Sequence, residues 1–266
     1  MDTVTVTLVN KPELYIEAYN ITPDAFAGKS LEEIGNLECH EGNYKTALKE
    51  FFTIAGKAGE TAESTKIIVK GDCSRVKRIG QKMTAGEVVI EGNADMYTAG
   101  WMIGGKVHVT GNVDAFCGIQ MEGGEFIIDG NADNHIGSSY RGDWRGMRGG
   151  LIRVGGNAGS DVGTFMIGGT IIIEGDAGIH IGTHAEGGTI IVKGNAMTRV
   201  GGQMVKGDIY IFGDIDIMMP GFRYVEDVEK EVDGKTATFA SYIGDLGERH
   251  PTRKGEVIYG NLYQKI

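Results

Sequence analysis

Polar and apolar residues alternate at regular places along the middle of the chain. Seven glycines are each followed, two and four residues later, by apolar residues, beginning with Val88 and Ile90 and ending with Ile209 and Ile211. All but one of these pairs are entirely β-branched, and this alternation predicts a short strand with one face in a core. The glycines that precede the strands are Gly86, Gly105, Gly124, Gly150, Gly169, Gly188 and Gly207.

Each predicted strand ends at a second glycine that is followed by Asn or Asp. This pair occurs eight times between residues 71 and 214, and five of the seven intervals are 19 residues. Glycine tolerates positive φ and the Asx side chain can bond nearby backbone, so each pair predicts a corner. A fixed period of this length indicates one unit stacked on itself. The Asx residues are Asp72, Asn93, Asn112, Asn131, Asn157, Asp176, Asn195 and Asp214.

These observations predict an all-β fold, a right-handed parallel β-helix of about seven to eight coils with a 19-residue period and a cap at each end. Thirty-three of the 44 glycines lie between residues 71 and 213, and each would cost a helix interior about 1 kcal/mol. One position of the repeat is almost always Met, and we expect it to fill the interior rather than to bind a soft metal. It holds Met83, Met102, Met121, Met147, Met166 and Met204, with Ala185 as the exception.

The regular repeat divides the chain into three parts. Residues 1–55 precede it and are predicted to be an N-terminal capping segment, with a capping box at Ser30 and a second short helix within residues 45–52. Residues 56–215 are the repeat domain. Residues 216–266 are predicted to be a C-terminal cap with a hairpin that turns at Asp233-Gly234.

The outward positions of the predicted sheet are unexpectedly apolar, although His108 and Arg153 interrupt them. A strand that is apolar on both faces is normally covered on both, and a contiguous exposed apolar strip marks an interface. We expect this strip to be covered by residues 1–55 or by another subunit. It consists of Val89, Ile127, Ile172, Ile191 and Tyr210.

An insertion within residues 138–143 lengthens one interval to 26 residues. It carries Tyr140 and Arg141, and Trp144 and Arg145 follow it directly. Tyr, Trp and Arg are the residue types enriched at interface hot spots, so these four residues are further interface candidates.

Stacking of the coils places Asp161 between His135 and His180 on neighbouring turns. Two imidazoles and a carboxylate can bind a metal. The alternative is a polar ladder in which Asp161 pairs with one histidine, and we favour it because no fourth ligand is evident. We therefore predict no catalytic, cofactor-binding or metal-binding residue in this chain.

The charge, hydropathy, cysteine content and motifs of the chain argue against several classes of function. The net charge of −10 and the lack of a basic stripe disfavour nucleic-acid binding. The sequence contains no run of about 18 apolar residues, which argues against membrane insertion. Three cysteines without a CxxC motif fit a reducing cytoplasm. No phosphate-binding loop or nucleophile elbow occurs.

The 13-residue unit from Gly80 to Gly92 recurs seven times as G/W-x-x-M-x-x-G-x-I-x-I-x-G, with mild departures at Ala99, Val113 and Ala185. It resembles the subunit designated C in formylmethanofuran dehydrogenase and, more distantly, the C-terminal β-helix domain of glutamate synthase. The resemblance implies a non-catalytic scaffold between formate-dehydrogenase-like and amidohydrolase-like subunits of an oxidoreductase complex. That complex reduces CO2 with methanofuran to formylmethanofuran in methanogenic archaea.

By the same resemblance, the molybdenum or tungsten pterin, the iron–sulfur clusters and the amidohydrolase metal site lie on other subunits. The equivalent subunit of a formyltransferase/hydrolase complex and a stand-alone glutamate-synthase-type domain remain alternatives. An enzyme of the left-handed β-helix kind is disfavoured, because its coils hold 18 residues rather than the 19 found here.

Overall fold

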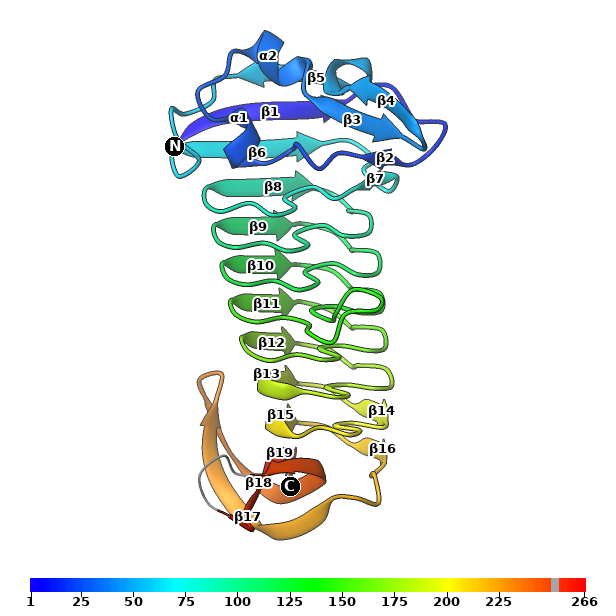
Figure 1. Ribbon diagram of the computed structural model, residues 1–266, viewed down its shortest axis with the longest axis vertical. Helices are drawn as coiled ribbons and strands as arrows, with labels where there is room; N and C mark the ends of the chain where they lie inside the picture. Colours follow the sequence, from blue (N-terminus) through cyan, green and yellow to red (C-terminus); the bar gives the residue numbers. More distant parts are fainter. Residues whose placement is uncertain (250–253) are drawn as a thin grey trace.

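The computed structural model describes residues 1–249 and 254–266, and its secondary structure is mostly strands. The chain forms a rod in which each strand of the repeat lies beside the equivalent strand of the next unit (Figure 1). Thirteen strands make one sheet in the order β17-β18-β19-β15-β13-β12-β11-β10-β9-β8-β6-β1-β5. The prediction of an all-β fold with a large parallel sheet is confirmed.

The strands and helices fall into three groups, which are the rod, its N-terminal end and its C-terminal end. The rod contains β6 (Thr65–Lys70), β7 (Val76–Lys77), β8 (Glu87–Glu91), β9 (Lys106–Val109), β10 (Glu125–Ile128), β11 (Leu151–Val154), β12 (Thr170–Ile173), β13 (Glu186–Val192), β14 (Ala196–Thr198), β15 (Lys206–Ile211) and β16 (Ile215–Ile217). The N-terminal end contains β1 (Asp2–Leu8), β2 (Ile16–Glu17), α1 (Pro23–Phe26), α2 (Leu31–Gly35), β3 (Glu38–Glu41), β4 (Tyr44–Ala47), the 3-10 turn η1 (Leu48–Glu50) and β5 (Phe52–Gly56). The C-terminal end contains β17 (Arg223–Val232), β18 (Lys235–Arg249) and β19 (Val257–Lys265).

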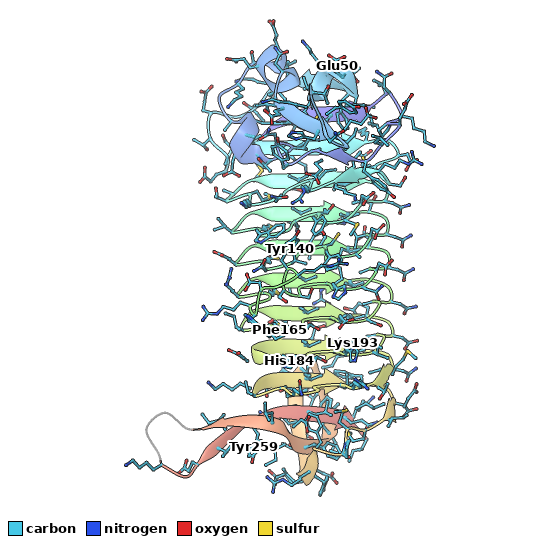
Figure 2. All side chains as sticks on the ribbon, turned by 45° about the vertical axis from the view of Figure 1, so that its right-hand side comes forward. Glu50, Tyr140, Phe165, His184, Lys193 and Tyr259 are labelled. Atoms are coloured by element: carbon cyan, nitrogen blue, oxygen red, sulfur yellow. The ribbon has the colours of Figure 1, made fainter. Side chains whose placement is uncertain are left out.

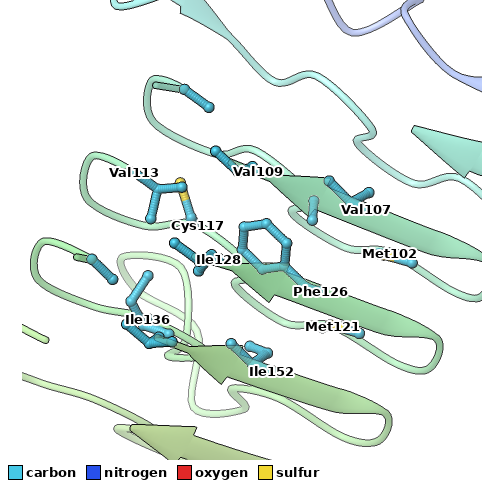
Figure 3. Close-up of a cluster of buried hydrophobic side chains, with 14 of the residues drawn as sticks. Met102, Val107, Val109, Val113, Cys117, Met121, Phe126, Ile128, Ile136 and Ile152 are labelled. Carbon is cyan, nitrogen blue, oxygen red and sulfur yellow. The ribbon is translucent and has the colours of Figure 1, made fainter. Parts of the chain in front are cut away.

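The inward residues of the parallel strands form one continuous core (Figure 3). Neighbouring strands pair in the predicted register, for example Val107 with Phe126 and Phe126 with Ile152. The first shortened coil also follows the prediction, because Ile67 pairs with Val88. The methionine column is fully buried within this core, as expected of an apolar filler.

The Asx corners form a hydrogen-bonded ladder along the rod. The Asn93 Oδ1 accepts from the backbone N–H of Asn112 at 2.8 Å, and the same contact repeats from coil to coil as far as Asp214. The exception is Asp72, whose carboxylate accepts from the Ser74 N–H. The predicted stacking of these corners is confirmed, and each corner fixes the position of the next.

Replacing Asn157 with Leu removes the acceptor for the Asp176 N–H. Because this corner is solvent-exposed, water replaces the lost bond in part, and we expect a loss of about 1 kcal/mol in the free energy of unfolding. Asn157→Asp keeps the acceptor and is the control. An unchanged urea midpoint for the Leu variant would contradict a stabilising ladder.

Asp95 is an ionisable group inside the rod, with 1% of its surface exposed. One carboxylate oxygen accepts from the Met96 N–H at 2.6 Å, and the other has no partner among the described residues. Burial therefore raises the pKa of Asp95 above its ordinary value.

Because the pKa of Asp95 is raised in the folded state, the folded state loses stability relative to the unfolded state as the pH rises. The loss begins at the ordinary Asp pKa and is complete above the raised pKa. We expect Asp95→Asn to stabilise the chain by about 1–3 kcal/mol at neutral pH, since it removes a buried charge that lacks a full set of partners. The gain should disappear below about pH 3.9, where both states are protonated. Thermal unfolding of both chains, measured from neutral pH down to below the ordinary Asp pKa, would give this gain at each pH. A gain that did not change with pH would contradict the expectation.

The N-terminal end agrees with the prediction in part. Strand β1 pairs in parallel with β6 and continues the main sheet. The capping box at Ser30 and Glu33 is present at the start of α2. The expected second helix at residues 45–52 is wrong, because that segment contains β4, the single turn η1 and the start of β5. The turn η1 instead links β4 to β5, and these two strands belong to different sheets.

The C-terminal hairpin turns at Asp233-Gly234, as predicted, and rises along the side of the rod (Figure 1). Its residues Val232 and Phe239 pack on Ile172 and Ile191, which are buried. The expectation that this part of the apolar strip lies under residues 1–55 or under another subunit is therefore wrong. The chain's own hairpin covers Ile172 and Ile191 and packs against Tyr210, while Val89 and Ile127 are only half-buried.

An ionic contact holds the hairpin turn on the rod. Asp233 Oδ1 lies 2.8 Å from an Arg153 guanidinium nitrogen, and its Oδ2 lies 3.0 Å from the Lys193 Nζ. Arg153 and Lys193 together lower the pKa of Asp233, with the hydrogen bond from Arg153 as the largest cause. Arg153, which interrupts the apolar strip in the sequence, thus pairs with the hairpin turn.

Candidate functional site

Two columns of side chains project from left-handed corners on one face of the rod. The residues of each column have positive φ although they are not glycine, and such a conformation costs about 1 kcal/mol or more at each position. Coil-to-coil backbone bonds, such as Phe116 N–H to Asn134 O at 2.9 Å, hold these corners in place. The first column has φ values between 60° and 69° and consists of Arg78, Tyr97, Phe116, His135, Asp161, His180 and Arg199. The second has φ values between 49° and 60° and consists of Lys82, Trp101, Gln120, Phe165, His184 and Gln203.

Rings stack along both columns. Phe116 and His135 lie 4.4 Å apart between ring centroids with an interplanar angle of 9°, and Phe165 and His184 lie 4.6 Å apart at 2°. Figure 2 shows Tyr140, Phe165 and His184 following one another along this face. The face is therefore a preorganised aromatic surface with little side-chain freedom left to lose.

The insertion forms a loop on this face between the two columns, and Gln120 anchors it. The buried Gln120 accepts from the Trp101 indole N–H at 2.8 Å and donates to the Asp143 carboxylate at 2.7 Å and to the Arg145 carbonyl at 3.0 Å. The hydrogen bond from Gln120 is the main reason that the pKa of Asp143 is lowered. The loop, residues 138–145, is held by these bonds and by the Ser139 N–H bond to the Thr164 carbonyl.

Two aromatic residues of the loop are exposed although they contact the columns. Trp144 is 73% exposed and meets the Phe165 ring edge-on at 5.6 Å. Tyr140 is 41% exposed and lies 5.7 Å from the Trp101 ring. The Arg141 guanidinium lies 5.8 Å from the Phe116 ring. We call Tyr140, Trp144, Phe116 and Phe165 the aromatic face.

A pocket of about 320 Å³ opens in the aromatic face beneath the loop, and Thr164 lies on its border with a second hollow. Five aromatic side chains line the first pocket, and Ser138 and Ser139 add polar groups. A pocket of this size fits one large side chain of another protein. It is lined by Phe116, His135, Tyr140, Arg141, Trp144 and Phe165, among others.

The second hollow contains the polar part of the first column. His180 Nδ1 lies 3.4 Å from the Asp161 carboxylate, and Arg199 lies 3.5 Å from the other ring nitrogen of His180. His135 instead stacks on Phe116. The structure thus pairs Asp161 with one histidine, as in the polar ladder that we favoured. Among the described residues, no group of three or more His, Cys, Asp or Glu is arranged to hold a metal.

The sequence indicates the part of the first column formed by His135, Asp161 and His180, and it indicates the loop, but it does not indicate that two columns and the loop form a single face. The second column lies two residues after a repeat glycine or its equivalent. That spacing was visible in the sequence, but the left-handed conformation that turns both columns outward was not.

The described residues contain no helix that is long and apolar enough to cross a bilayer.

Parts of this chain are similar in sequence to known proteins. None of the known family models matches the chain. In Methanococcus maripaludis, the subunit designated C of tungsten-containing formylmethanofuran dehydrogenase 2 is 52% identical over 147 residues, which are 55% of this chain and 53% of that protein. The protein of the same name from Methanothermobacter wolfeii is 45% identical over 97 residues, 36% of each chain. The matches thus span about a third to about half of these relatives.

A solved structure matches nearly the whole length. It is a chain of the formyltransferase/hydrolase complex from Methylorubrum extorquens, crystallised with methylofuran. The TM-score is 0.83 over 98% of this chain and 99% of that one, with 22% sequence identity, so the likeness is one of fold. The resemblance to the subunit designated C of formylmethanofuran dehydrogenase is therefore confirmed, and over the matched segments the chain is a homologue of those subunits.

Proposed function

We propose that this chain is the subunit designated C of a formylmethanofuran dehydrogenase and serves there as a rigid scaffold. It would hold a formate-dehydrogenase-like and an amidohydrolase-like subunit at a fixed separation in a cytoplasmic complex. That complex would reversibly reduce CO2 with methanofuran to N-formylmethanofuran during methanogenesis in archaea. The names of its homologues support the assignment to the complex.

The geometry of the rod supports a scaffolding role. Nine parallel pairings join β1 through β19 in one ladder, and at about 4.8 Å each they span about 43 Å. The buried core and the Asx ladder tie each coil to the next. Such an element bends little, so subunits bound at two places along it would keep their distance.

The observation that carries the proposal is the exposure of Trp144 and Tyr140 on an anchored loop. An exposed Trp beside an aromatic pocket is costly to leave in water and is typical of an interface hot spot. Because Gln120 fixes the loop, little conformational entropy is lost when a partner binds. We propose the aromatic face as the contact with one catalytic subunit.

The redox cofactors and metal sites would reside on the other subunits. Cys39, Cys73 and Cys117 are all buried in the core, and burial raises the pKa of each thiol, to about 12 for Cys39 and Cys73. A thiolate is the species that ligates iron–sulfur clusters. These cysteines are poor candidates for such ligation, which is consistent with a structural subunit.

The test is to purify the tagged chain from its native cells and identify the proteins and metals that accompany it. We expect both catalytic subunits at fixed stoichiometry, with molybdenum or tungsten in the assembly. Among the alternatives to this proposal, the fold match supports the equivalent subunit of a formyltransferase/hydrolase complex. Transferase subunits without molybdenum or tungsten would establish that alternative. A chain that purifies alone would reject both.

A further inference from the structure

Strand β17 is the last strand of the 13-stranded sheet, and within residues 1–249 and 254–266 it pairs only with β18. It is ten residues long and most of its side chains are exposed. The free edge of such a strand presents backbone N–H and C=O groups that another strand can bind. Long open edges are uncommon in isolated proteins, so the residues along this one indicate what it accepts.

The hairpin geometry identifies the groups that face the free edge. Val232 and Lys235 flank the two-residue turn, and in such a hairpin the flanking residues exchange both hydrogen bonds. Hydrogen bonding to β18 then recurs at every second residue, at Lys230 and Val228. The backbone groups of the intervening residues point away from β18. These residues are Asp227, Glu229 and Glu231.

The side chains of β17 alternate between two faces of the strand. Val228, Lys230 and Val232 lean toward the rod, where Lys230 Nζ lies 4.6 Å from the Tyr263 ring. Asp227, Glu229 and Glu231 are exposed on the opposite side. The three residues with free backbone groups are thus all acidic and lie on one face of the strand.

We propose that the edge of β17 binds an extended segment of another protein that carries Lys or Arg at every second position. Its backbone would pair with Asp227, Glu229 and Glu231, and the Cβ atoms of its basic residues would lie about 5 Å from those of the acidic residues. A second copy of this chain is disfavoured as the occupant. Antiparallel pairing of two β17 strands would set Asp227 against Glu231 and Glu229 against itself. This proposal does not depend on the function proposed above.

The test uses the full chain and a synthetic peptide, Thr-Lys-Val-Lys-Val-Lys-Thr, at low ionic strength. One control peptide has Glu in place of Lys, and another has the same composition in the order Lys-Lys-Lys-Val-Val-Thr-Thr. We expect the alternating Lys peptide to bind at least about tenfold more tightly than either control, the order given by three cross-strand charge pairs. Amide exchange should slow at residues 227, 229 and 231.

Three variants of the chain complete the test. Glu229→Lys with Glu231→Lys should weaken binding about tenfold or more, whereas Glu60→Lys with Glu63→Lys makes the same charge change on an exposed loop and should not. Glu229→Pro removes one outward N–H and no bond to β18, so it should weaken binding without unfolding the hairpin. Equal effects of both charge variants, equal binding of both Lys peptides, no binding at all, or a dimer that protects β17 would each overturn the proposal.

Discussion

Replacing Ile172 with Asp is expected to lower the free energy of unfolding of the isolated chain by about 3 kcal/mol or more. Ile172 is 4% exposed and packs beneath Val232 and Phe239 of the C-terminal hairpin. A carboxylate there would be buried without a partner. Arg153, the residue opposite Ile172 on the neighbouring strand, is already paired with Asp233 and Glu174. The urea midpoint and amide exchange in β17 and β18 would measure the effect.

Two controls separate charge burial from lost packing. Ile172→Val removes one methylene and should cost about 1 kcal/mol. Ile127→Asp places the same charge on the half-buried part of the apolar strip and should cost less than Ile172→Asp. If Ile172→Asp left both the midpoint and the exchange of the hairpin unchanged, the hairpin would not cover this strip in solution.

Removing the two exposed rings of the aromatic face is expected to weaken binding of one catalytic subunit by about a hundredfold. Alanine substitution at an interface hot spot costs about 2 kcal/mol or more, and Tyr140→Ala with Trp144→Ala removes both rings. Because neither side chain belongs to the buried core, with Trp144 73% and Tyr140 41% exposed, the thermal midpoint should change little. Titration of the separate catalytic subunit with each chain would give the ratio of dissociation constants.

The matched control is Tyr44→Ala, which removes an aromatic side chain that is also exposed but lies on the N-terminal end. It should leave binding unchanged. If the double variant bound both catalytic subunits as tightly as the natural chain does, the aromatic face would not be an interface.

The repeat made the rod predictable from the sequence. A glycine, two inward apolar residues and an Asx corner recur at fixed spacing, so the register of Val88, Val107 and Phe126 followed from spacing alone. Local chemistry also sufficed for the Asp233-Gly234 turn and the capping box at Ser30. These features depend on contacts close in sequence or on exact repetition.

Features that depend on distant, unrepeated contacts were not predictable. Nothing in the spacing of the outward residues indicates that Phe239 folds back on Ile172 and Ile191. Gln120 is one polar residue of the repeat until the structure shows it holding the loop through Asp143. The same applies to the aromatic face, which requires two columns of left-handed corners to meet one insertion.

Reconstitution from separately purified subunits tests the scaffold most directly. The formate-dehydrogenase-like and amidohydrolase-like subunits would be mixed with and without this chain, and the assemblies weighed by native mass spectrometry. We predict that the two catalytic subunits form one particle only when the chain is present, and that the chain alone neither reduces CO2 nor hydrolyses formylmethanofuran. Assembly of the two catalytic subunits without the chain, or either activity in the chain by itself, would contradict the account.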